Sequence, residues 1–586
     1  MNNNLYLFNL LGLSGFLLLF IIFIDHKSAF IDNYAFSSDL SQASLDKISE
    51  FEKWNCGINN DVNSNQYVKE FRIPEICSIP ISIAFDEKEN KVWFVGTRNG
   101  TLFEYNPINQ EFISYKIPKW FSRDLPAGSS WSWDLKSDVS GNTIWFTDEK
   151  LNSIWSFDKN KKKFAQFTIP FSSTLYSTSY PVSFEFVDEK NLYLVGIRSL
   201  SLWHGAIDKM VNGTSLGIEE IPIPLNKIFK GIPEYEIGLG SLAIDNDKKN
   251  IWITALAFDK KGAVIKYDTE GKKFYLYELP DSFRSPTGIT IDSNNHIWIT
   301  DHATSSFYKV QPPKESRKLT ALDMEHFVTS PLSSRIYGMG FGNTSSKSIN
   351  LYENSLPYWI KDAPDGTIWT NEHVGNRIAK FVPVNDTMVE YWLPSQNSIY
   401  SGCNPDDTNI KCGYSNVLNF DLESKVLPNL SSQISKVWFT EQSENKIGFI
   451  DLEKEIPISL TTIPNFLNIK NENIDETIEL QMKVNVEQTG VDSIYTQSLL
   501  SSNSSIILKP VISSTLSPNG NLNGLQVTFS PEILQINLDK INNKSNNIIN
   551  ITIKPIQHIT PGKYNLMVGV ESHDFTITKK VKLNVD

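Results

Sequence analysis

The 586-residue sequence has little of what most enzymes use for chemistry. It contains four cysteines and eight histidines. It has no paired CxxC, HExxH, nucleophile elbow or phosphate-binding loop. Basic residues are also in the minority, because 54 Lys and Arg stand against 66 Asp and Glu, for a net charge of −12. A surface of that sign repels a phosphate backbone, so we expect no nucleic-acid partner.

The longest apolar run lies at the N-terminus. Residues 5–24 (LYLFNLLGLSGFLLLFIIFI) carry no charge and are about as long as a membrane-spanning helix. Bulky side chains fill the run to its end and no basic residue precedes it, which favours an uncleaved anchor at 1–24 over a removable signal segment. We therefore predict a single-pass protein of the cell membrane, with residues 25–66 as a stalk and the rest extracytoplasmic. Secretion after cleavage is the alternative.

The four cysteines fall into two sequence-local pairs, Cys56 with Cys77 and Cys403 with Cys412. Four cysteines allow three connectivities, and the local one is the simplest. In an oxidising compartment each pair forms a disulfide that staples a loop. Metal ligation is the rival interpretation, although no CxxC or histidine-rich spacing supports it.

A short strand-like segment centred on an aromatic residue recurs seven times, each time followed by a polar turn and a second such segment. The aromatics are Trp93, Trp145, Tyr193, Trp252, Trp298, Trp369 and Trp438. Alternating runs precede and follow each pair, so every repeat offers four short antiparallel strands. This pattern is typical of the blades of a β-propeller and predicts seven of them over residues 67–455. The aromatic ring should fill the space between neighbouring blades.

The two ends of the repeat region indicate how the ring closes. The last copy lacks a convincing fourth strand, whereas residues 67–74 (YVKEFRIP) form an orphan strand before the first copy. We expect this N-terminal strand to complete the seventh blade and so remove an open sheet edge.

The composition changes at about residue 456, where the aromatic repeat stops and other alternating runs begin. These runs predict a C-terminal β-sandwich over 456–586. Its phrase ITPGKYNLMVGVE resembles the late hairpin of immunoglobulin-like domains of prokaryotic surface proteins, and we expect it to serve as a spacer or in adhesion. The predicted fold class is therefore all-β: a seven-bladed propeller, a C-terminal sandwich and an N-terminal transmembrane helix.

Two phrases of the repeat, DGTIWTNEHVGNRIAKFVP and KVWFTEQSENKIGFID, resemble the repeat of the streptogramin B lyase (virginiamycin B lyase) family. The resemblance implies a seven-bladed propeller with Mg²⁺ on its axis and a His/Glu constellation that opens the ester of a cyclic depsipeptide by elimination. Where that family has Pro-His-x-Ile, this sequence reads PTGI from Pro286 and PYWI from Pro357, without histidine. The Glu that follows the aromatic strand persists as Glu372 and Glu441.

Carboxylates gather three residues after the aromatic in neighbouring repeats five, six and seven, as Asp301, Glu372 and Glu441. Because equivalent positions lie on one face of a propeller, these three predict a site for Mg²⁺ or Ca²⁺. Glu372, His373 and Glu441 are the candidate catalytic groups, acting as acid or base beside a bound cation. The alternative is structural: the acids bond the amides of turns and His302 and His373 lie on the loop surface.

Arginines after the same strand, Arg98, Arg198 and Arg377, are placed to balance the acids in ion pairs. Two function classes follow from the whole sequence. The first is a membrane-anchored extracytoplasmic propeller that binds a small-molecule, glycan or protein ligand through its loop face. The alternative is a Mg²⁺-dependent lyase that opens an ester or lactone, as in virginiamycin B lyase.

Overall fold

A computed structural model describes residues 52, 55–57, 63–120, 130–171, 176, 178–257, 260–332, 354–397, 417–425, 433–472, 476–487, 505–537 and 547–586. The predicted anchor at 1–24, most of the predicted stalk, and Cys403 with Cys412 lie outside these residues. None of the helices among the described residues is long and apolar enough to cross a membrane.

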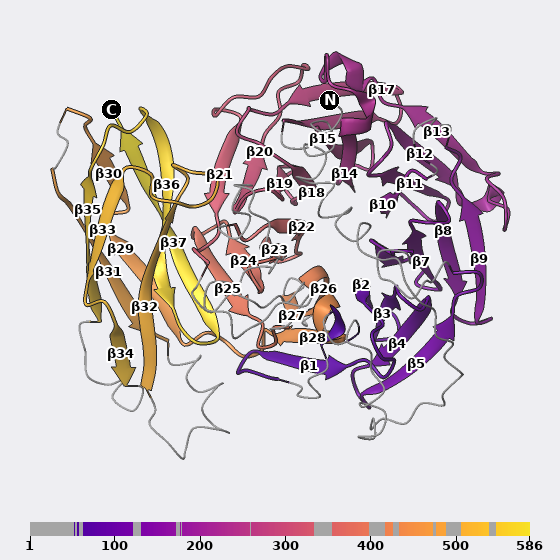
Figure 1. The fold of residues 1–586 in the computed structure, drawn as a ribbon, viewed down its shortest axis with the longest axis horizontal. Coiled ribbons are helices and arrows are strands. Elements are labelled where there is room, and N and C mark those ends of the chain that lie inside the picture. The colour runs from indigo at the N-terminus through magenta and orange to yellow at the C-terminus, as the bar shows by residue number, and fades with distance from the viewer. Residues whose placement is uncertain are drawn as a thin grey trace, which may run out of the picture.

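The described residues form seven four-stranded antiparallel units arranged in a ring, with a further β-domain beside it (Figure 1). The inner strands are buried along nearly their whole length, as in β2 (Pro80–Asp86) and β18 (Pro286–Ile291). Tight turns with left-handed residues such as Asn90 and Asn152 join the strands. The first strand of each unit lies nearest the ring's centre (Figure 1). The all-β propeller predicted from the repeat is therefore present.

Blades one to three are β2 (Pro80–Asp86), β3 (Lys91–Gly96), β4 (Thr101–Asn106) and β5 (Glu111–Lys116); β6 (Leu135–Ser137), β7 (Thr143–Asp148), β8 (Ser153–Asp158) and β9 (Lys163–Thr168); and β10 (Pro181–Phe186), β11 (Asn191–Gly196), β12 (Ser201–Ala206) and β13 (Ile218–Pro222). Blades four and five are β14 (Ile237–Ile244), β15 (Asn250–Ala257), β16 (Lys261–Asp268) and β17 (Lys273–Glu278); and β18 (Pro286–Ile291), β19 (Ile297–Asp301), β20 (Ser306–Val310) and β21 (Met324–Val328).

Blade six is β22 (Pro357–Asp362), β23 (Ile368–Glu372), β24 (Arg377–Val382) and β25 (Thr387–Trp392), and blade seven is β26 (Val417–Lys425), β27 (Gln433–Glu441), β28 (Lys446–Asp451) and β1 (Val68–Arg72). Short 3₁₀ turns are η2 (Ile207–Lys209), η3 (Leu225–Lys227), η4 (Glu234–Glu236) and η7 (Gln442–Glu444).

The aromatic of each second strand is buried, and the rings of blades one, two, three, five and seven contact the next blade, as predicted. The ring centroid of Trp93 lies 5.8 Å from that of Phe157 in blade two, and the centroid of Trp438 lies 5.9 Å from that of Tyr105 in blade one. Aromatic rings bury large apolar areas and prefer tilted contacts at such distances. They therefore hold neighbouring blades together around the ring.

The N-terminal strand closes the ring, which confirms the predicted clasp. β1 pairs antiparallel with β28 in five register pairs, from Val68 opposite Ile450 to Arg72 opposite Lys446. Blade seven is thus built from both ends of the propeller segment. The disulfide between Cys56 and Cys77 is also present, as the sequence predicted.

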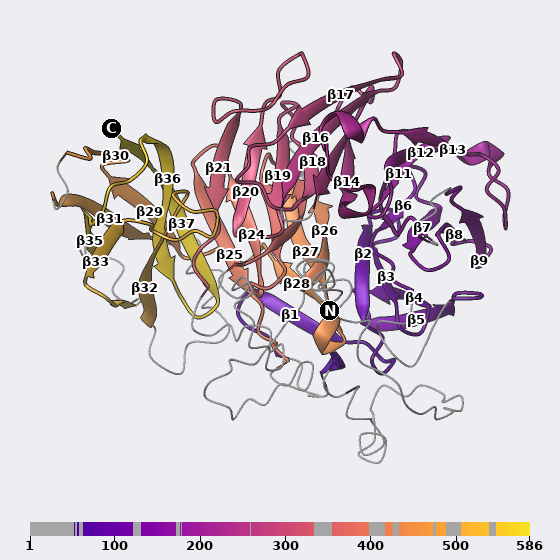
Figure 2. The same cartoon turned by 45° about the horizontal axis from the view of Figure 1, so that its top comes forward.

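The C-terminal residues form two packed sheets that share a core (Figures 1 and 2). One sheet has the order β29 (Ile458–Ile463), β31 (Ile478–Val486), β35 (Ile548–Pro555), β33 (Leu525–Ser530). The other contains β37 (Phe575–Val585), β36 (Gly562–Glu571), β32 (Ser505–Ser514) and β34 (Leu534–Asn537), with β30 (Phe466–Ile469) parallel to β37. An immunoglobulin-like relationship of this domain stays a prediction.

The C-terminal domain continues a propeller blade, which the sequence did not predict. β37 pairs antiparallel with β25, so that blade six and the second C-terminal sheet form one nine-stranded sheet (Figure 2). Lys580, 8% exposed, reaches Glu325 and Asp386 at 2.6 Å each. The indole of Trp392 donates to Thr576 at 3.0 Å. These contacts dock the domain on blades five and six, whereas a loosely tethered spacer would lack them.

Candidate functional site

The candidate carboxylates lie where second strands end and third strands begin, on one face of the ring that we call the loop face. On this face each first strand also starts, since it runs antiparallel to the second. The first strands line the centre, so a residue at the end of a second strand is close to the axis but one strand removed from it.

Asp301, and Asp148 at the equivalent position of blade two, accept hydrogen bonds from backbone amides of their own blades. Asp148 accepts bonds from the amide of Leu151 at 3.1 Å and the indole of Trp155 at 2.9 Å. Asp301 accepts bonds from the amides of Arg284 at 3.0 Å and Ser285 at 2.6 Å. Burial raises the pKa of Asp148, and its hydrogen bonds oppose the rise. These are the backbone-bonding roles that acids at strand ends often take.

Glu372 instead belongs to a buried charge group with Arg377 and Glu390, all three fully buried. Its Oε2 pairs with Nη2 and, at 3.1 Å, with Nε of Arg377. Glu390 lies 3.6 Å from the same guanidinium and accepts the amide of Ser330 at 2.8 Å. Burial raises the pKa of Glu372 to about 8 against the attraction of Arg377, and Glu390 adds to the rise. Two carboxyls therefore share one guanidinium, and one of them holds its proton near neutral pH.

Blade seven repeats this arrangement with lysine as the cation. Lys446 lies 3.2 Å from Glu70 and 3.8 Å from Glu444, with Glu441 beside them. A side-chain hydrogen bond links the carboxyl of Glu441 to that of Glu70. Burial raises the pKa of Glu441 well above its usual range, and the Glu70 carboxyl adds to the effect. Burial also raises the pKa of Glu444 to about 7.

The two groups occupy equivalent register positions. In each, an acid ends the second strand, a cation directly opposite begins the third, and a second acid on the fourth strand lies opposite the residue two beyond the cation. Other blades place uncharged or singly charged pairs at the third- and fourth-strand positions: Ser153 with Gln166, Ser201 with Glu220, and Ser306 with His326.

The two loop histidines are brought together. His373 Nδ1 lies 3.3 Å from His302 Nε2, and their rings stack with centroids 5.0 Å apart. Tyr358 meets His302 edge-on, with centroids 4.7 Å apart. Burial lowers the pKa of His302 to about 4, so this ring is neutral at physiological pH. The alternative that both histidines lie on the loop surface is wrong for His373, which is 4% exposed.

The same tyrosine closes the axis. Tyr358 of blade six stacks on Trp133, which precedes β6 of blade two, with centroids 6.2 Å apart. The carbonyl of Trp133 accepts a bond from Asn419 of blade seven at 3.1 Å, and its indole donates to Glu149 at 2.9 Å. Residues of blade two thus meet residues of blades six and seven at the centre. Beside them lies a crevice without interior space for a water-sized molecule, lined by Gly240, Ser241, Thr287, Gly288, Tyr358 and Trp359.

The predicted cation site stays a prediction. Among the described residues no group of three or more His, Cys, Asp or Glu is arranged to hold a metal ion. Asp301 serves turn amides, Glu372 pairs with Arg377, and Glu441 lies with Glu70 and Lys446, so each acid is engaged within its own blade. Of the three arginines expected to balance acids, Arg377 forms an ion pair with the predicted site residue Glu372.

Sequence reasoning missed the fourth-strand acids, Glu390 and Glu70. Their signal was present, since each lies four residues before the proline that follows a fourth strand, Pro74 and Pro394. The register that brings them to Arg377 and Lys446 depends on strand pairing. Arg198 makes a different contact from the expected one, lying 4.0 Å from the ring centroid of Tyr180.

A family model for the NHL repeat matches residues 283–306, in the inner part of blade five. No curated protein matches the sequence. Among solved structures, a streptogramin B lyase is 17% identical, with a TM-score of 0.44, covering 66% of this chain and 97% of that one.

Two other solved structures are less similar in sequence. A catalytically inactive virginiamycin B lyase from Staphylococcus aureus with quinupristin is 14% identical, with a TM-score of 0.42 and coverage of 66% and 98%. The extracellular domain of a putative one-component system from B. thetaiotaomicron is 13% identical, with a TM-score of 0.39 and coverage of 86% and 57%. The propeller assignment rests on the strand topology, and a specific relationship to the lyases stays a prediction.

Proposed function

We propose that this chain is a membrane-anchored, extracytoplasmic propeller that binds a ligand or partner through its loop face. The observation that carries this is the filled axis, where Trp133 and Tyr358 stack across the centre. The crevice beside them has no interior space even for a water-sized molecule, whereas ordinary ligand pockets span roughly 300–1,000 Å³. A ligand therefore makes its contacts on the face.

The loop face carries the residue types that dominate protein binding surfaces. Trp131, Tyr176 and Arg198 are half-buried there, and the guanidinium of Arg198 lies 4.8 Å from the ring centroid of Tyr176. Trp, Tyr and Arg contribute most of the binding energy at many interfaces. Their rings offer large rigid surfaces at a small cost in conformational entropy. This composition suits a glycan or protein ligand as well as a small molecule.

The extracytoplasmic placement is supported by two features near the N-terminus. A disulfide joins Cys56 and Cys77, and such bonds persist in oxidising compartments. The uncharged run at 5–24 is long enough to span a bilayer. A membrane-impermeant amine reagent applied to intact cells should label Lys161, whose side chain is 73% exposed. Labelling only after lysis would contradict the placement.

Binding is tested by photo-crosslinking on the full-length protein in cells. The photoreactive residue p-benzoylphenylalanine replaces Tyr235, which is 42% exposed on η4 at the loop face. The matched control replaces Ile108, 79% exposed in the turn between β4 and β5 on the opposite face. We expect an adduct from position 235 and none from position 108. Equal labelling at both positions would refute binding through the loop face.

The lyase remains a second candidate because His302 and His373 stack beside Tyr358, with Glu372 next in sequence to His373. A neutral imidazole is a suitable general base. Incubation with quinupristin tests this: elimination opens the ring without adding water, so the product keeps its mass and changes its chromatographic retention. Conversion of quinupristin by the wild-type protein that is lost in His373→Asn would favour the lyase. Absence of conversion by the wild-type protein would eliminate the lyase as a candidate.

A further inference from the structure

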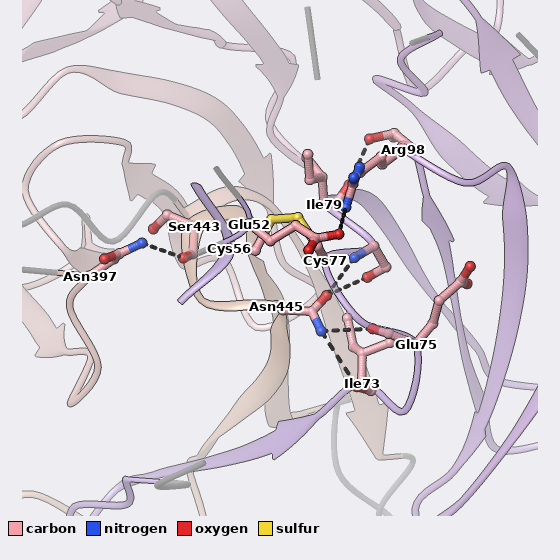
Figure 3. Close-up of a disulfide and its surroundings, with 12 residues drawn as sticks. Glu52, Cys56, Ile73, Glu75, Cys77, Ile79, Arg98, Asn397, Ser443 and Asn445 are labelled. Atoms are coloured by element: carbon pink, nitrogen blue, oxygen red, sulfur yellow. Dashed lines mark hydrogen bonds and ion pairs between the residues drawn. A yellow bond between two sulfur atoms is a disulfide. The ribbon is translucent and has the colours of Figure 1, made fainter. Parts of the chain in front are cut away.

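The ring closes at the seam between blades seven and one, where the chain leaves β1 of blade seven and enters β2 of blade one. Asn445, in the loop between β27 and β28, joins the two sides of this seam by hydrogen bonds (Figure 3). Its side-chain oxygen accepts bonds from Ser78 N at 2.8 Å and Ser78 Oγ at 2.6 Å, and its amide nitrogen donates to the carbonyl of Glu75 at 2.8 Å.

The disulfide brackets the clasp strand. Cys56 precedes β1 and Cys77 follows it, with a sequence separation of 21 and Cα atoms 5.1 Å apart. The five residues of β1 therefore lie inside a covalently closed loop. Both cysteines are buried, at 2% and 1% exposed, so reductants in solution reach the bond only when the seam opens.

The chain on either side of Cys56 lies against both blades. Glu52 forms an ion pair with Arg98 of blade one at 2.9 Å (Figure 3). Gly57 has φ of +58°, and a Cβ placed there would lie 2.7 Å from Glu444 Oε2 of blade seven. Only glycine fits this close approach in a left-handed conformation.

From this geometry we propose that the Cys56–Cys77 disulfide locks the ring closed. The disulfide transmits a mechanical force applied to the N-terminal chain directly to β2, so that the clasp strand β1 does not bear it. Any pull on the chain from its N-terminal side passes from Cys56 through the sulfurs to Cys77 and on to β2. The β1–β28 ladder lies outside that path and bears no load. Without the bond, the same pull acts directly on β1, which pairs with one strand through only five register positions.

The lock also opposes spontaneous opening. A detached β1 whose two flanks are joined has far fewer conformations than one with a free N-terminal flank, so opening gains less entropy. This inference concerns closure of the ring and holds whichever ligand the loop face binds. The membrane anchor predicted at residues 1–24 would be a source of force on the N-terminal chain, although the lock does not depend on it.

Single-molecule pulling on the chain from residue 52 onward, with handles at its two ends, tests the load path. In the oxidised protein we expect no extension event before blade unfolding. With Cys56→Ser and Cys77→Ser we expect an early low-force extension of about 70 Å, the contour of the released loop at ~3.5 Å per residue. The same first event in both proteins would overturn the proposal.

Hydrogen exchange at residues 68–72 tests opening without force, on the full chain. The double variant should exchange there at least about 10-fold faster than the wild type, as expected from lost loop closure. The matched control, Cys403→Ser with Cys412→Ser, should leave this exchange unchanged. Equal exchange in all three proteins would overturn the lock.

A second comparison covers the case in which the double variant does not accumulate. The folded wild-type protein is then measured before and after reduction by a dithiol, which becomes a disulfide while the protein gains two thiols. Faster exchange at 68–72 alone supports the lock. Unchanged exchange after confirmed reduction overturns it.

Discussion

Replacing Arg377 with methionine removes the cation that Glu372 and Glu390 share and keeps most of the side-chain volume. All three residues are fully buried, and the guanidinium lies 3.1 Å from Glu372 through Nε and 3.6 Å from Glu390 through Nη2. The guanidinium also donates to the carbonyl of Ser330 at 2.9 Å. In the variant two buried carboxyls face each other with no compensating charge.

The expected loss is large and depends on pH. Removing one partner of a buried ion pair costs about 3–5 kcal/mol, because the remaining charge is uncompensated. Burial already raises the pKa of Glu372 to about 8 with the arginine present, and without it the pKa rises further. A raised carboxyl pKa means that the folded state holds more protons than the unfolded state, so stability falls as pH rises above about 4.5. The variant should therefore lose most at pH 8 and recover towards pH 5.

Urea unfolding followed by tryptophan fluorescence at both pH values measures this loss. Arg377→Lys is the matched control, because lysine occupies the equivalent place in blade seven, and it should lose less than the methionine variant. Adding Glu372→Gln and Glu390→Gln to Arg377→Met should restore much of the stability, since no buried charge remains. A loss below about 1 kcal/mol at pH 8, or equal losses at both pH values, would refute the buried charge group.

Three further predictions follow from the same physics. Glu441→Gln keeps the side-chain shape and removes a carboxyl whose pKa is raised by burial and by Glu70. The variant's melting temperature should therefore exceed that of the wild type at pH 9 and match it at pH 5. A lower melting temperature than the wild type's at pH 9 would contradict this. Lys580→Met removes ion pairs at 2.6 Å to Glu325 and Asp386. The change should cost about 1 kcal/mol of stability, because both acids are partly exposed, and should speed proteolytic cleavage between the propeller and the C-terminal domain. An unchanged cleavage rate would contradict the docking. Trp298 is fully buried and its ring centroid lies 5.9 Å from that of Phe381 in blade six. Trp298→Ala should cost about 3–5 kcal/mol in urea unfolding, and a loss under about 1 kcal/mol would mean that this ring does not hold the two blades together.

The parts of the fold that depend on local pattern were predictable from the sequence. The aromatic of each repeat marks the second strand because a ring that fills an interblade space must recur once per blade, and Trp93, Trp298 and Trp438 are fully buried as expected. The clasp was predictable from a missing strand at one end and an orphan at the other. Both inferences need only strand count and alternation.

The parts that depend on register and docking were not predictable. Glu70 meets Lys446 across 376 residues of sequence, and only the pairing of β1 with β28 brings them together. The docking of β37 on β25 cannot be recognised from the sequence of either strand, because every edge strand presents the same row of unpaired backbone groups. The candidate acids were found, but what they do depends on these partners.

The charged groups of blades six and seven lie beside the two places where the propeller joins other parts of the chain. β25 of blade six accepts β37, and β1 of blade seven arrives from the N-terminus. A one-residue slip of β1 would withdraw Glu70 from Lys446 and turn the exposed Lys69 towards the buried face. Two ammonium groups would then lie in a site built for one, at the cost of burying an unpaired charge. The Glu70–Lys446 pair thus penalises wrong registers of the clasp, and the Cys56–Cys77 disulfide then holds the correct one.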